Sequence, residues 1–148
     1  MKLSDVLKGI KVNGEYTDVD IVDITADSRK VGAGFLFVCI KGASFDGHTV
    51  AKDMVKQGAV AVVAEHDLGL KNQVLVDDSR AVLSEMCSNF FSNPAEKLKL
   101  IGLTGTNGKT TTTFLIKQIL ENMGKKVGLI GTVQNMVGDE VYPAHYTT

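Results

Sequence analysis

Residues 98 to 111 read Leu98-Lys99-Leu100-Ile101-Gly102-Leu103-Thr104-Gly105-Thr106-Asn107-Gly108-Lys109-Thr110-Thr111. An apolar run is followed here by a glycine-rich turn and then, from Phe114 to Met123, by a stretch with helical periodicity. A strand, a glycine loop and a helix in that order turn backbone N–H groups toward one point at a helix N-terminus. The stretch therefore predicts an α/β fold with an anion-binding loop.

The side chains of this loop favour a nucleotide with magnesium. Lys109 would reach the β- and γ-phosphates, and the hydroxyl of Thr110 would lie on the metal ion. The general phosphate-loop pattern has a glycine where this chain has Leu103, so a turn that binds nothing is the alternative. Threonines 110–113 are poor choices for helix stability alone, because β-branched side chains lose freedom in a helix. A ligand role explains them better.

Outside the loop, apolar runs alternate with helical patterns along the whole chain. Four β-like runs lie at 21–25, 35–40, 59–64 and 73–76. A helix from Asp77 or Asp78 should end at Asn93-Pro94, because proline cannot continue it. We therefore expect an α/β domain with a mostly parallel sheet over residues 1–96 and a second domain beginning at residue 97.

The second domain should open with a parallel pair of strands. The run at 98–103 and a second run at 127–130 flank the predicted helix, which fits a strand–helix–strand crossover. Gly124 is placed to end that helix, and residues 134–142 indicate a hairpin turning at Gly138-Asp139. Residues 97–148 therefore predict the truncated beginning of a nucleotide-binding domain with a phosphate loop.

Composition excludes several classes of protein. A net charge of −1 over 148 residues argues against nucleic-acid binding, and no apolar run approaches the roughly 20 residues of a membrane span. Cys39 and Cys87 are isolated and flanked by apolar residues, so they indicate neither a zinc site nor a disulfide framework. The sequence predicts a cytosolic protein.

Two polar motifs in the first domain are weak on their own. Asp27-Ser28-Arg29 can be a turn that ends a strand, and Asp46-Gly47-His48 can be a turn before a helix. His48 by itself is more often a partly exposed surface residue than a catalytic one. His66 and His145 have no partners at metal-ligand spacing.

Taken together, these segments resemble the N-terminal domain of the Mur ligase family, and the glycine loop resembles that family's ATP-binding loop. The matching segments are Asp27 to Val31, Gly34 to Val38, Lys41-Gly42, Asp46 to His48, Gly58 to Val63 and Gly102 to Thr112. Later residues favour the MurE-type branch over the MurF-type branch, which adds the terminal dipeptide. They are Thr106-Asn107, Gly128 to Thr132, Tyr142 to Ala144 and Thr147-Thr148.

The resemblance implies an ATP- and Mg²⁺-dependent amide ligase of peptidoglycan synthesis. It would activate UDP-N-acetylmuramoyl-L-alanyl-D-glutamate as an acyl phosphate and join it to a diamino acid, meso-diaminopimelate or lysine. Carried over by position, the ATP-binding residues are Gly105, Thr106, Asn107, Gly108, Lys109, Thr110 and Thr111, with Lys109 and Thr110 as catalytic residues and Thr110 on the metal. Ser28 would bind the uridine diphosphate, the loop from Gly42 to Phe45 would contact uracil, and Thr147 and Thr148 would contact the muramoyl-peptide.

The same resemblance sets an expectation about turnover. The remaining metal ligands, a carbamylated lysine and the residues that select the amino acid would lie beyond residue 148. We therefore expect the 148-residue chain to bind its ligands without turnover. A non-catalytic UDP-binding module, for which residues 1–96 would suffice, is the alternative from another class.

Overall fold

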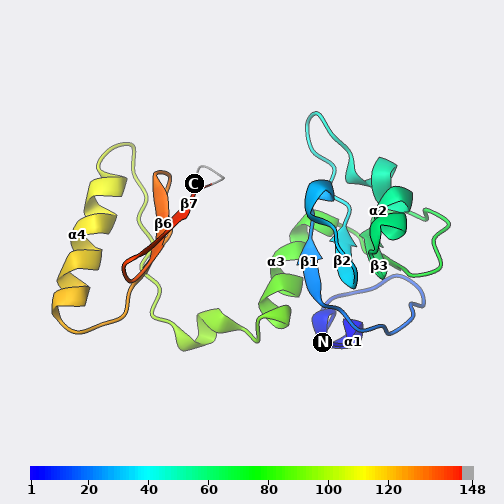
Figure 1. The fold of residues 1–148 in the computed structure, drawn as a ribbon, viewed down its shortest axis with the longest axis horizontal. Coiled ribbons are helices and arrows are strands. Elements are labelled where there is room, and N and C mark those ends of the chain that lie inside the picture. The colour runs from blue at the N-terminus through cyan, green and yellow to red at the C-terminus, as the bar shows by residue number, and fades with distance from the viewer. Residues whose placement is uncertain (145–148) are drawn as a thin grey trace. The chain divides into compact units, whose positions relative to one another are not determined.

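A computed structural model describes residues 1–144 of the chain, which divides into two compact units, Met1–Lys99 and Leu100–Thr148 (Figure 1). The sequence places the boundary at residue 96, three residues earlier. No helix in the described residues is long and apolar enough to span a membrane.

The first unit is built on a parallel sheet in the order β1-β2-β3-β4. The strands are β1 (Asp23–Thr25), β2 (Phe35–Val38), β3 (Ala61–Ala64) and β4 (Gln73–Leu75). Leu36 pairs with Ala61 and Val38 with Val63, and every residue of β3 is buried. The continuous apolar runs of the sequence are explained by this burial, because both faces of a parallel sheet are covered. The expected α/β fold with a mostly parallel sheet is confirmed.

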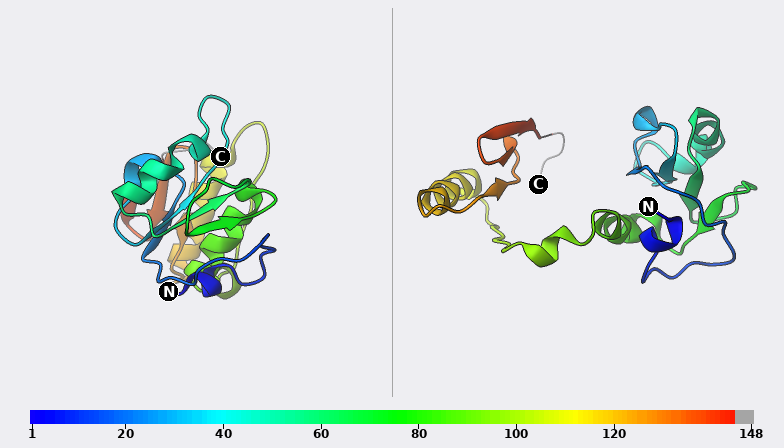
Figure 2. Two further views of the ribbon diagram at one scale, coloured as in Figure 1. Left: turned by 90° about the vertical axis from the view of Figure 1, so that its right-hand side faces the viewer. Right: turned by 60° about the horizontal axis from the view of Figure 1, so that its bottom comes forward.

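Helices cover both faces of this sheet (Figure 2). The helical segments of the first unit are α1 (Leu3–Val6), η1 (Ser28–Lys30), η2 (Gly47–Val50), α2 (Ala51–Gln57), α3 (Ser79–Phe90) and η3 (Pro94–Lys97). One core joins Leu3 of α1 and Met86 of α3 to Val63. The other joins Met54 of α2 to Val62, because neighbouring residues of a strand point to opposite faces.

Local signals set several helix ends in this unit. The Asp78 side chain accepts a hydrogen bond from the Ala81 N–H and so caps α3, while Gly58 ends α2 with a φ of 121°. The end predicted for α3 at Asn93-Pro94 is wrong. The helix stops at Phe90, and the chain turns through positive φ angles at Ser92 and Asn93 before the proline.

The second unit contains one long helix and an antiparallel sheet in the order β5-β6-β7 (Figure 1). Its elements are α4 (Lys109–Asn122), β5 (Gly128–Leu129), β6 (Gln134–Val137) and β7 (Glu140–Pro143). The predicted hairpin over 134–142 is confirmed by the antiparallel pairing of β6 with β7. Gly124 has a φ of 75° and donates to the Glu121 carbonyl, as expected of the residue that ends α4.

The predicted strand at 98–103 and its parallel pairing with 127–130 are wrong for the described residues. Residues 98–103 form no ladder, and Leu98, Leu100 and Ile101 are each at least 60% exposed. Gly128 and Leu129 pair instead with β6 in an antiparallel manner. A strand requires hydrogen bonds from a neighbour, so an apolar run defines a strand candidate and not its partner.

Candidate functional site

The turn before α4 is built on two glycines with left-handed backbone. Gly108 directly precedes the helix with a φ of 76°, and Gly105 has a φ of 148°. No side chain caps the first turn of α4. The first N–H groups of a helix have no acceptor within it, so those of α4 must find partners elsewhere.

The backbone N–H groups of residues 105–111 have no hydrogen-bond acceptor within residues 1–144. The first N–H group near the helix start with a partner is that of Thr112, which donates to the Gly108 carbonyl at 2.9 Å. These N–H groups and the positive end of the helix dipole form a donor set suited to phosphate oxygens. The predicted loop residues, from Gly105 to Thr111, lie together in this one turn.

Lys109 adds a positive charge to the same turn. Its Nζ donates to the Gly105 carbonyl oxygen at 2.6 Å, although Gly105 lies four residues earlier in the chain. The side chain is half-buried, so it is folded back along the loop and does not extend into solvent. Its ammonium therefore lies beside the backbone that would hold the phosphates.

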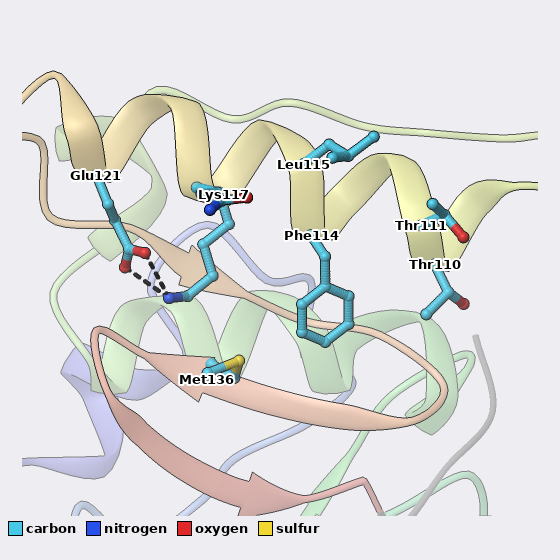
Figure 3. Close-up of a pocket in the computed structure, with 8 residues that line it drawn as sticks. Thr110, Thr111, Phe114, Leu115, Lys117, Glu121 and Met136 are labelled. Atoms are coloured by element: carbon cyan, nitrogen blue, oxygen red, sulfur yellow. Dashed lines mark hydrogen bonds and ion pairs between the residues drawn. The ribbon is translucent and has the colours of Figure 1, made fainter.

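Two hollows of the second unit adjoin this turn. The smaller, of about 200 Å³, is lined by Lys109 and Thr110 and by residues of 101–103, 113–114 and 129–134. The larger, of about 470 Å³, lies between α4 and Met136 of β6 (Figure 3). In it the Lys117 ammonium contacts both carboxylate oxygens of Glu121, at 2.6 and 2.7 Å. The ion pair neutralises this wall of the larger hollow. The smaller hollow, which Lys109 lines, is therefore the better candidate for phosphates.

The available metal ligands are few. The Thr110 hydroxyl is exposed and makes no hydrogen bond with the described residues. No group of three or more His, Cys, Asp or Glu side chains that could hold a metal ion occurs within residues 1–144. Thr110 thus provides a single oxygen where a phosphate-bound magnesium ion would need further ligands from phosphates or water.

Ser28 lies in the first unit, just beyond the carboxyl end of β1. Asp27 caps the short helix η1 by accepting from the Arg29 N–H, and the Arg29 guanidinium contacts both Asp27 oxygens, at 2.9 and 2.7 Å. These hydrogen bonds from the Arg29 side chain and backbone lower the pKa of Asp27 to about 2. The half-buried Ser28 hydroxyl makes no hydrogen bond with the described residues. The predicted substrate residues Thr147 and Thr148 lie outside the described residues.

His48 is buried, so its expected exposure at the surface is wrong. Its side chain is 4% exposed, its Nδ1 lies 2.6 Å from Asp46 Oδ1, and its Nε2 accepts from the Glu65 N–H at 3.2 Å. Hydrogen bonds from the His48 backbone and ring lower the pKa of Asp46. The Asp-Gly-His spacing indicates the first contact, but no sequence signal indicates the second, because Glu65 is seventeen residues away.

Two family models match the chain. The model described as "Mur ligase family, catalytic domain" matches residues 20–91, and the model described as "Mur ligase middle domain" matches residues 103–148. The two matched segments fall in the two compact units and together span most of the chain.

Individual proteins agree with the family models. The UDP-N-acetylmuramoyl-L-alanyl-D-glutamate–2,6-diaminopimelate ligase of Caldanaerobacter subterraneus subsp. tengcongensis is 48% identical over 100% of this chain and 32% of its own length. A solved structure of a ligase with that name has a TM-score of 0.77 at 25% identity, over 100% of this chain and 31% of its own. The MurF ligase of Thermotoga maritima in complex with ADP has a TM-score of 0.58 at 29% identity. This match covers 74% of the present chain and 25% of the Thermotoga chain. The chain thus spans between a quarter and a third of the length of these proteins.

Proposed function

The chain belongs to the Mur ligase family, and from this premise we propose that the whole protein is a MurE-type ligase of peptidoglycan synthesis. It would act in the cytoplasm on UDP-N-acetylmuramoyl-L-alanyl-D-glutamate and join it to a diamino acid, either meso-diaminopimelate or lysine. The 48% identity to a ligase named for this substrate, over the full chain, carries the proposal.

The turn before α4 would hold ATP. The unpartnered N–H groups of residues 105–111 would bind phosphate oxygens, and Lys109 would exchange its contact with the Gly105 carbonyl for the β- and γ-phosphates. The Thermotoga ligase in complex with ADP supports a nucleotide in this family. Magnesium on the Thr110 hydroxyl would neutralise charge on the transferring phosphoryl group.

The first unit would hold the uridine diphosphate part of the substrate. Open parallel sheets bind ligands beyond the carboxyl ends of their strands, and Ser28 lies just beyond that end of β1. The loop from Gly42 to Phe45 follows β2 on the same edge, and its residue Phe45 is 49% exposed. These features support Ser28 as a diphosphate ligand and the loop as a contact for uracil. Thr147 and Thr148 would contact the muramoyl-peptide.

A MurF-type ligase is the second candidate, because several MurF structures resemble the chain at 28–31% identity. One of them is named for joining D-alanyl-D-alanine to a substrate that already carries diaminopimelate. The two branches therefore differ in the length of the peptide on the UDP-muramoyl substrate.

Calorimetry with the 148-residue chain tests these assignments. We expect UDP-muramoyl-dipeptide to bind more tightly than UDP or UDP-muramoyl-tripeptide, and Ser28→Ala to weaken both UDP and the dipeptide substrate. Ser84→Ala, on the exposed surface of α3, serves as the matched control. Tighter binding of the tripeptide would indicate a MurF-type ligase, and equal binding of UDP and the dipeptide would indicate a UDP-binding module. ATP-dependent phosphate release by this chain would contradict the expected lack of turnover.

A further inference from the structure

The loop from Lys41 to Asp46 is a tight arch at the carboxyl edge of the parallel sheet. Its two end residues form an isolated antiparallel bridge, and the Gly42 N–H donates to the Phe45 carbonyl at 2.8 Å. Arg80 of α3 donates to the Lys41 carbonyl at 3.0 Å and so holds the first end of the arch. Hydrogen bonds within the arch and from α3 therefore define its shape.

His48 holds the other end of the arch. Because its Nε2 accepts the Glu65 N–H, that nitrogen carries no proton, and the ring proton lies on Nδ1 and is donated to Asp46. The ring is thus neutral and in one tautomer. The backbone of Gly47 packs closely against that of Ile40. Only glycine fits here, since a Cβ at this position would lie 2.9 Å from the Ile40 nitrogen.

Glu65 connects His48 to the rest of the carboxyl edge of the sheet. Its backbone N–H holds His48, while its Oε1 accepts from the Ser79 N–H at 3.1 Å and lies 2.8 Å from the Ser79 hydroxyl. Ser79 is fully buried and also contacts the Cys39 carbonyl at the end of β2. The arch is therefore fixed to the ends of β2 and β3 and to the start of α3.

We propose that His48 is a positioning residue that, in its neutral form, holds the arch Lys41–Asp46 in the shape that binds the uridine end of the substrate. The inference rests on the proposed function of the first unit. His48 itself is buried beneath the arch and acts through Asp46 and Glu65.

Protonation of His48 should release the arch. A second ring proton would place an N–H group against the Glu65 N–H, so one anchor would be lost while the contact with Asp46 remained. The other charged or titratable groups nearby are Lys41, the side chain of Glu65, Cys39, and His66, whose ring centroid lies 4.7 Å from that of His48. Burial raises the pKa of the Cys39 thiol to about 12, so the thiol keeps its proton in the range of interest. Substrate affinity should therefore decrease as the pH is lowered.

The test is titration of the chain with UDP-N-acetylmuramoyl-L-alanyl-D-glutamate between about pH 8 and pH 5, where histidine changes charge. This substrate suits the test because its doubly esterified diphosphate keeps its charge over that range. We expect His48→Gln and His48→Asn to bind the substrate about 3- to 10-fold more weakly at high pH, because each variant loses one hydrogen bond. The affinity of these variants should also depend less on pH than that of wild type. His66→Gln removes the other histidine at this edge, and the affinity of this variant should still decrease at low pH, because His48 remains.

Imidazole ¹⁵N spectra of the wild-type chain provide a measurement that needs no variant. A proton on Nδ1 and none on Nε2 is expected at high pH, and the opposite tautomer would overturn the proposal. Wild-type affinity in folded His48 variants, or an unchanged pH profile in them, would overturn it as well and leave the proposed function intact. No binding of the substrate by wild type at any pH would reject the proposed function and the inference with it.

Discussion

The Nζ of Lys109 donates to the Gly105 carbonyl oxygen at 2.6 Å, so the first residue of α4 closes over the loop that precedes it. The contact places a cation next to N–H groups that have no acceptor within residues 1–144. A phosphate entering the turn would meet both the N–H donors and the ammonium, which is the arrangement that phosphate recognition requires.

Lys109→Ala should weaken binding of Mg·ADP by about tenfold or more, because a hydrogen bond to a charged group contributes about 1.5–3 kcal/mol. Calorimetry on the 148-residue chain measures the change. Lys125→Ala, in the exposed segment after α4, removes the same charge outside the loop and should leave the affinity unchanged. Equal losses in the two variants would show that Lys109 acts only through net charge.

Gly58→Ala should destabilise the first unit by about 2–4 kcal/mol, because both its φ of 121° and a Cβ 2.9 Å from the Ala33 Cα are unfavourable. Gly14→Ala has a comparable φ of 95° but no atom within 4 Å of the new Cβ, so it should cost only about 1 kcal/mol. Denaturant unfolding of both variants measures the difference. Equal costs would mean that the backbone near Ala33 moves to accommodate the methyl group.

Ser79→Ala should cost about 1–3 kcal/mol of unfolding free energy, because the Cys39 carbonyl and Glu65 would lose a buried partner. Ser84→Ala is the control from the same helix, α3, since Ser84 is exposed and makes only a 3.5 Å contact with the Ala81 carbonyl. The control should change stability by less than about 0.5 kcal/mol. If Ser79→Ala lowers the unfolding free energy no more than the control does, Ser79 does not anchor the edge of the sheet.

Asp27 should remain ionised down to about pH 2, because Arg29 holds its pKa at about 2. A carboxyl pKa lowered on folding gives stability that is present above the unfolded pKa of about 4 and is lost as the pH falls through the folded value. A ¹³C titration of the carboxyl group by NMR measures the midpoint directly. In Arg29→Ala the midpoint should rise toward the ordinary value, and an unchanged midpoint would assign the shift to another group.

Local sequence features were enough to place most of the helices and strands. The caps at Asp78 and Gly58, the buried runs of β2 and β3 and the hairpin turn at Gly138 act between neighbouring residues or through simple periodicity. The loop from Gly105 to Thr111 was likewise recognisable, because its glycines and the start of α4 are contiguous in the chain.

Local sequence features did not show which strands pair or which polar side chains are buried. The run at 98–103 has the composition of a strand but has no neighbour among the described residues, and β5 pairs antiparallel with β6. His48 is buried because Asp46 and the end of β3 enclose it, and Glu65 is distant in the sequence. Both outcomes depend on which segments meet in space.

The sequence by itself determined the α/β class, the family and the position of the glycine-rich turn before α4, because periodicity and contiguous motifs encode them. Only the tertiary structure decided that a buried His48 contacts both Asp46 and the Glu65 N–H at one end of the arch from Lys41 to Asp46. It also decided that the Lys109 ammonium contacts the Gly105 carbonyl. The physical reason is that hydrogen bonds and burial depend on groups that folding brings together from distant parts of the chain, and local sequence patterns do not show which groups will meet.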